Sequence, residues 1–275
     1  MAGAYSNKTL HNYVHGLRAW HILYGIPWTI DENEVRTMLN AAEKLAPPNS
    51  KRKKRRPYTP DFILAVKNHL DMSCPLDAAV YACLTTCFYA AARLGEFTVP
   101  RLNGFDPAKH VTPMGLSQSV DRLGNEMTVL RLPRSKANNQ GEDVHWAKQE
   151  GGTDPVAALE HHRHLNAPPE NGHLFAYKFR DGHRPLTKPK FIQRVAAAAR
   201  SAGLEPLQGH GIRIGATLEY LLRGVPFDVM KAKGRWASDA FQLYLTKHAQ
   251  ILAPYMQAVP NVQAAFTRYI VPPVR

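Results

Sequence analysis

The spacing of apolar residues predicts that most of this chain is helical. In many segments apolar side chains recur every three or four residues, which places them on one face of a helix. Some of these segments open with a capping residue followed by proline, as in Thr59-Pro60 and Asp154-Pro155. The predicted helices span residues 6–25, 31–45, 59–70, 75–92, 153–165, 188–202, 211–223, 226–233 and 238–248.

Between residues 116 and 149 the pattern changes from helical spacing to strand composition. The segments LSQSV, MTVLRLP and DVHWAK are rich in strand-forming residues, and the stretches 121–125 and 136–141 that separate them are rich in turn residues. This pattern predicts a small antiparallel sheet, whereas residues 168–185 read as irregular. The fold class expected is therefore mainly α with a small antiparallel β-sheet, of the α+β type.

A break in the pattern after residue 46 divides the chain. Pro47 and Pro48 end the second helix, and the next charged stretch is an unbroken run of six cations. Like charges repel one another and keep such a run extended, so we expect a helical module over 1–48, a basic linker over 49–57 and a larger domain over 58–275. The six cations are Lys51, Arg52, Lys53, Lys54, Arg55 and Arg56.

The overall charge favours a polyanionic partner. The 275 residues include 35 Lys and Arg against 22 Asp and Glu, a net charge of +13, and double-stranded DNA is the first candidate. The basic run is suited to phosphates of a duplex backbone and equally to nuclear import. There is no long apolar run and no cationic-then-apolar start, so we expect a soluble, unsecreted protein, nuclear in a eukaryote and otherwise cytoplasmic.

Cysteine and histidine patterns give no metal site. Cys74, Cys83 and Cys87 form no Cys-x-x-Cys pair, and buried reduced thiols are the expected state. The histidines at 161, 162 and 164 have only Glu160 nearby as a further ligand, so they are expected on a polar helical surface. We expect no metal and no cofactor.

Candidate chemistry centres on the stretch from His210 to Tyr244. His210 and Arg213 stand three apart at a predicted helix start, where an imidazole, a guanidinium and the helix N-terminus favour a phosphodiester. Tyr244 becomes a nucleophile only where a nearby base or positive charge helps its phenol to ionise.

Two further residues have both a structural and a functional interpretation. Arg93 directly follows the apolar helix at 75–92, and it either pairs with Glu96 or meets a substrate phosphate. Lys136 lies in the turn of a predicted hairpin, where a lysine promotes solubility or delivers a proton into a cleft.

Arg93 with Glu96, Lys136 on a hairpin, His210-x-x-Arg213, Trp236 and Tyr244, in this order, resemble the active-site set of the tyrosine recombinase (phage integrase) family. The resemblance covers residues 57–256 and, through Gly-Arg-Trp-Ala-Ser-Asp-Ala-Phe, is closest to the recombinases of fungal Crypton-type mobile elements. It implies the catalytic fold of that family over 58–275 and a partial DNA-binding module over 1–48.

The resemblance also implies a role for each catalytic residue. Arg93 and Arg213 would hold the scissile phosphate, Lys136 would protonate the leaving 5′-oxygen and His210 would aid proton movement. Trp236 would contact the phosphate through its indole N–H. Tyr244 would attack to form a 3′-phosphotyrosine bond without metal or cofactor, which fits chemistry that depends on positioning and charge.

Two features depart from the family pattern. The step from Trp236 to Tyr244 is one residue shorter than in many members, and Tyr220 and Tyr255 are the other candidate nucleophiles. The N-terminal part contains only two predicted helices of a module that usually helps to clamp DNA.

The implied activity is site-specific strand exchange for integration or excision of a mobile element, by four protomers on two duplexes. Residues 262–270, with an apolar stripe, would serve as a docking helix for the same or a neighbouring subunit. The alternatives are DNA relaxation of the type IB topoisomerase kind and a domesticated DNA-binding protein that no longer cuts.

Overall fold

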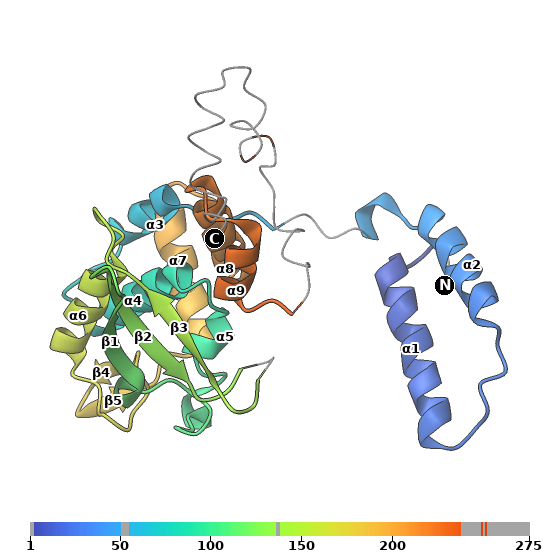
Figure 1. The fold of residues 1–275 in the computed structure, drawn as a ribbon, viewed down its shortest axis with the longest axis horizontal. Helices are drawn as coiled ribbons and strands as arrows, with labels where there is room; N and C mark the ends of the chain where they lie inside the picture. Colours follow the sequence, from blue (N-terminus) through green and yellow to red (C-terminus); the bar gives the residue numbers. More distant parts are fainter. Residues whose placement is uncertain (1–2, 51–54, 136–137, 238–248, 250, 252–275) are drawn as a thin grey trace. The chain divides into compact units, whose positions relative to one another are not determined.

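A computed structural model describes residues 3–50, 55–135, 138–237, 249 and 251. The chain divides into two compact units, residues 1–54 and 55–275, and Figure 1 shows both. Each unit is described below by itself.

The smaller unit is a pair of packed helices, α1 (Asn7–Leu23) and α2 (Glu32–Lys44). Ser6 caps the first helix and Asp31 the second, each through a side-chain oxygen that accepts from backbone N–H groups. The buried core of the unit is small and consists of Leu10, Leu39 and Ala42. Two helices were expected here, and the structure confirms both.

The larger unit is built around α4 (Pro75–Tyr89), in which nearly every residue is buried. It packs against helices from earlier and later parts of the sequence, which explains why its sequence is apolar on all sides. The other helices of this unit are α3 (Pro60–Lys67), α5 (Leu94–Phe97), α6 (Pro155–Asn166), α7 (Lys188–Ser201), α8 (His210–Leu222) and α9 (Phe227–Gly234). Short 3₁₀ turns lie at Pro48–Ser50, Leu102–Gly104 and Pro113–Gly115.

A three-stranded antiparallel sheet forms one side of the larger unit. Its strands β1 (Leu116–Val120), β2 (Glu126–Leu132) and β3 (Glu142–Trp146) are neighbours in that order. In Figure 1 they run side by side, while α8 and α9 lie together on the opposite side of this view. The sheet and the helices confirm the mainly α class with a small antiparallel sheet.

Two short elements were not predicted from the sequence. Residues 168–185, expected to be irregular, contain the hairpin of β4 (Tyr177–Phe179) and β5 (Gly182–Arg184). The apolar helix ends at Tyr89 rather than near residue 92, because Ala91 adopts a left-handed conformation with φ of 49°. The chain then restarts as α5, so Arg93 lies at the beginning of a new helix instead of the end of the old one.

Two of the three cysteines lie in the core of the larger unit. Cys83 and Cys87 are buried free thiols, and burial raises the pKa of both. Among the described residues, no helix combines the length and apolar character that crossing a membrane requires.

Candidate phosphodiester-binding site

Glu96 fixes the backbone and the side chain of Arg93. Its Oε2 accepts from the Arg93 backbone N–H at 2.9 Å, and its Oε1 accepts from Nη1 of Arg93 at 3.0 Å. The Glu96 side chain is only 6% exposed, whereas that of Arg93 is 31% exposed. The ion pair and the functional reading of Arg93 are therefore compatible, because the guanidinium is held by Glu96 and still reaches the surface.

Helix α8 begins beside the segment that follows the basic run. The carbonyl of Gly211 accepts from the Tyr58 backbone N–H at 3.1 Å. A Cβ on Gly211 or Gly215 would collide with the backbone at Arg56 or Tyr58, so only glycine permits this approach. The close packing places residues 55–58 along the first turns of α8.

The charges of four cations act on His210 at the start of α8. Burial lowers the pKa of His210, and the charges of Arg55, Arg213, Arg93 and Lys188 lower it further. The imidazole is thus neutral near neutral pH and able to accept a proton. Lys188, the first residue of α7, was not singled out from the sequence; its position is a consequence of the fold.

Arg213 lies one helical turn beyond His210 and is only 2% exposed. Its Nη2 donates to the carbonyl of Gly234, and its Cζ lies 4.3 Å from the centre of the Trp236 ring. The indole therefore covers the guanidinium by a cation–π contact. In this arrangement Trp236 contacts Arg213 itself, so a phosphate that reaches Arg213 must approach along the edge of the indole or displace it.

Arg235 was not among the residues predicted, although it stands between Gly234 and Trp236 in the stretch singled out. Its backbone is left-handed, with φ of 57°, and its side chain is 9% exposed. Its Nη2 lies 2.6 Å from Glu96 and its Nη1 lies 2.7 Å from Glu142. An arginine directly after a glycine at a helix end was the available signal.

A surface hollow of about 460 Å³ opens beside Arg93. Lys109, His110 and Arg134 line it together with Arg93, so its charge is mostly positive. Arg134 and Ser135 belong to the turn between β2 and β3, where Ser135 N–H donates to the Asn138 carbonyl at 2.9 Å. An anion in this hollow would meet several cations at once.

Several predicted residues lie outside the described part of the chain. These are Lys136, Tyr244, the alternative Tyr255, the segment 262–270 and four of the six cations of the basic run, Lys51, Arg52, Lys53 and Lys54. The two remaining cations are described: the charge of Arg55 acts on His210, and Arg56 pairs with Glu205 at 2.6 Å.

Tyr220, the other alternative nucleophile, is bound within the fold. Its hydroxyl donates to the Tyr89 carbonyl at 2.8 Å, and burial raises its pKa. A phenol that donates its proton to a backbone carbonyl and is difficult to ionise is poorly suited to attack phosphorus.

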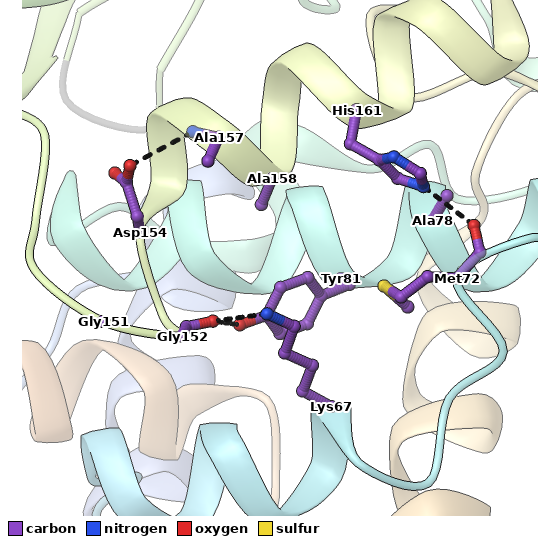
Figure 2. Close-up of a pocket in the computed structure, with 10 residues that line it drawn as sticks. All are labelled: Lys67, Met72, Ala78, Tyr81, Gly151, Gly152, Asp154, Ala157, Ala158 and His161. Carbon is purple, nitrogen blue, oxygen red and sulfur yellow. Dashed lines mark hydrogen bonds between the residues drawn. The ribbon is translucent and has the colours of Figure 1, made fainter.

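A second cavity of about 220 Å³ lies between α3, α4 and α6 (Figure 2). Lys67 and Tyr81 converge there on the carbonyl of Gly152, and His161 meets the carbonyl of Met72 at 2.8 Å. These polar groups bind the protein's own backbone, so they fasten the loop at Gly152 to α3 and α4. Among the described residues no cluster of His, Cys, Asp and Glu is arranged to hold a metal ion.

No family model matches the chain, and no curated protein matches it. Among solved structures it is similar to the crystal structure of XerA recombinase, with 13% identity and a TM-score of 0.49 over 92% of this chain and 84% of that one. It is also similar to an FLP recombinase–Holliday junction complex, with 13% identity and a TM-score of 0.44. That match covers 81% of this chain and 56% of the FLP chain.

Proposed function

We propose that the chain is a DNA breaking and rejoining enzyme of the tyrosine recombinase type, which exchanges strands at specific sites of a mobile element. The observation that carries the proposal is the hollow beside Arg93, which Lys109, His110 and Arg134 also line; the charges of Arg93, Arg213 and Lys188 act together on His210. These residues come from separate elements, and together they form a positively charged site around a neutral imidazole. Such a site matches a phosphodiester in the transition state of phosphoryl transfer.

The reaction proposed uses the chain's own side chains. The Tyr244 oxygen attacks phosphorus, forming a phosphotyrosine ester at the 3′ end, and the bond from phosphorus to the 5′-oxygen breaks. The phenol proton leaves with the help of His210, and Lys136 donates a proton to the departing 5′-oxygen. The new ester retains the phosphodiester energy, so a 5′-hydroxyl from another strand reverses the reaction and rejoins the DNA.

Binding and assembly follow from the same proposal. Double-stranded DNA is the substrate, with the basic run at 51–56 and the hollow beside Arg93 meeting its phosphates. Strand exchange requires two duplexes, so the active assembly would contain several copies of this chain, four by the resemblance.

The test is capture of the covalent adduct. A pool of duplexes carries a nick just downstream of a randomised site and a label on the 5′ end of the nicked strand. Cleavage next to the nick releases a short fragment, so the adduct cannot be resealed. The wild-type chain is expected to give a labelled adduct that survives SDS, and Tyr244→Phe is expected to give none.

Tyr220→Phe is the matched control and should still form the adduct, because that hydroxyl bonds Tyr89 within the fold. An adduct that persists in Tyr244→Phe and disappears in Tyr255→Phe would assign the nucleophile to Tyr255. If the folded wild-type chain formed no adduct with any duplex of the pool, the proposed enzymatic activity would be rejected. Relaxation of plasmid by isolated protomers, without pairing of two sites, would assign the topoisomerase reaction instead.

A further inference from the structure

Arg235 joins two carboxylates that come from different parts of the fold. Its two terminal nitrogens lie 2.6 Å from Glu96 on α5 and 2.7 Å from Glu142 on β3. The side chain is 9% exposed, so water screens these ion pairs little. A planar guanidinium suits this bridge because its nitrogens point in fixed and different directions.

Each of the two carboxylates lies next to a part of the chain that belongs to the proposed active site. Glu96 also accepts two hydrogen bonds from Arg93, one from its backbone and one from its guanidinium. Glu142 pairs with Leu132 across the β2–β3 ladder, at the base of the turn that contains Lys136. Arg235 itself precedes Trp236, whose ring lies on Arg213.

Charge balance explains what the bridge does. Glu96 is shared by Arg93 and Arg235, so neither arginine is fully neutralised by it. Burial alone would raise the pKa of Glu96, but Arg235 and Arg93 outweigh burial and hold that pKa below its ordinary value. Without Arg235, the charge of Glu96 would act on Arg93 alone, and Glu142 would lose its buried partner.

We propose that Arg235 is a positioning residue, which holds Glu96 and Glu142 so that Arg93 and the base of the β2–β3 turn face the same phosphate. This inference rests on the proposed function. Arg235 is not expected to touch the DNA itself, because both of its terminal nitrogens are engaged by carboxylates.

The first measurement is made on the free protein. The Nε–Hε NMR resonance of Arg93 is assigned by its loss in Arg93→Lys and is then followed in Arg235→Gln. We expect this resonance to shift, because Glu96 turns wholly toward Arg93. A resonance that stays in place overturns the inference, whether or not the chain cleaves DNA.

The second measurement separates binding from cleavage. In Arg235→Gln we expect adduct formation on the nicked duplex to slow about 100-fold, the size typical of a small misplacement of reacting groups. The affinity for intact duplex should stay within about threefold, because most of the phosphate contacts remain. Arg235→Lys keeps the positive charge but loses the planar guanidinium that reaches both carboxylates. Its rate of adduct formation should therefore lie between those of Arg235→Gln and the wild type.

The matched control is Arg194→Gln. Arg194 forms an ion pair at 2.6 Å with the buried carboxylate of Asp77, near the N-terminus of α4. The Arg194→Gln substitution should lower the melting temperature and leave the rate of adduct formation by the folded protein unchanged. The double variant Arg235→Gln with Glu142→Gln should be faster than Arg235→Gln, because the unpaired carboxylate is removed.

Equal loss of duplex affinity and adduct rate in Arg235→Gln, or a rate within about twofold of wild type, overturns the inference. Absence of any adduct with the wild-type chain rejects the proposed function, and the Arg93 resonance then decides the link between Arg235 and Arg93 by itself.

Discussion

Lys233 is a half-buried cation near the end of α9. Its Nζ donates to the His145 carbonyl at 3.1 Å and lies 4.6 Å from the centre of the Tyr220 ring. Burial lowers the pKa of Lys233 to about 8, and the charge of Arg223 lowers it further. The single hydrogen bond and the ring do not replace the water that a charged ammonium loses.

This pKa predicts how the stability of the larger unit depends on pH. At Lys233 the unfolded chain, with an ordinary lysine pKa, binds more protons than the folded chain above pH 8, so this residue makes stability rise with pH in that window. Lys233 alone should add about 1.5 kcal/mol to the free energy of unfolding between about pH 8 and pH 9.5, whereas the buried thiols of Cys83 and Cys87, whose pKa values are raised, favour the opposite trend in that interval. Urea unfolding at several pH values measures this gain.

Lys233→Met is the control, because it keeps the apolar stem and removes the titrating group. Because the thiols titrate in both proteins, the free energy of unfolding of the wild type should rise by about 1.5 kcal/mol relative to that of Lys233→Met over the same interval. The same pH dependence in both proteins would contradict the assignment to Lys233. The interval stops below the range in which Tyr58, Tyr81 and Tyr220, whose pKa values are also raised, lower stability further as pH rises.

Two glycines determine how closely helix α8 packs against the preceding segment of the larger unit. Gly211 and Gly215 leave room for the backbone at Arg56 and Tyr58, which lies against the start of α8. Tyr58 is buried, and its hydroxyl donates to the Leu207 carbonyl at 3.2 Å. The contact therefore fixes both the beginning of the larger unit and the neighbourhood of His210.

We expect Gly215→Ala to destabilise the larger unit by about 1–3 kcal/mol, because the new methyl group collides with backbone that cannot turn aside. The same change should displace Arg55 and so shift the His210 titration seen by NMR. Gly95→Ala is the matched helical control, since a Cβ there has open space. Equal stability of the two variants would show that α8 and the segment 55–58 separate easily.

At the scale of the whole chain, the basic run at 51–56 spans the boundary between the two compact units. Arg56 already pairs with Glu205, and Arg55 lies near His210, so these two cations have roles within the larger unit. Lys51, Arg52, Lys53 and Lys54 remain as the cations best suited to DNA phosphates along the linker.

Replacing these four residues by glutamine should weaken binding to every duplex sequence alike. Each lost phosphate contact lowers the slope of log affinity against log salt by about 0.9, so four contacts would lower it by up to about 3.6. Fluorescence anisotropy over a range of salt concentrations measures the slope. An unchanged slope would show that the run does not contact the duplex. As a control, Arg101 and Arg122 of the larger unit are replaced by glutamine, which tests whether the loss of any surface cations has the same effect.

The sequence by itself determined the elements whose signals are local. Apolar spacing and caps predicted the helices, and strand composition with turn residues predicted β1 to β3, because burial of one face repeats with the period of each element. It also singled out Arg93, His210, Arg213 and Trp236 through their order along the chain. Their roles stay proposals, since residue order carries no distances.

Only the tertiary structure decided which of these residues meet. Arg93 and Arg213 act on one imidazole because α5 and α8 pack around α4, and no local pattern encodes that contact. The same holds for Arg235, which reaches Glu96 and Glu142 across long stretches of sequence. Periodicity reports whether a side chain is buried, but long-range packing selects the partner that satisfies its charge, and that choice places Trp236 over Arg213.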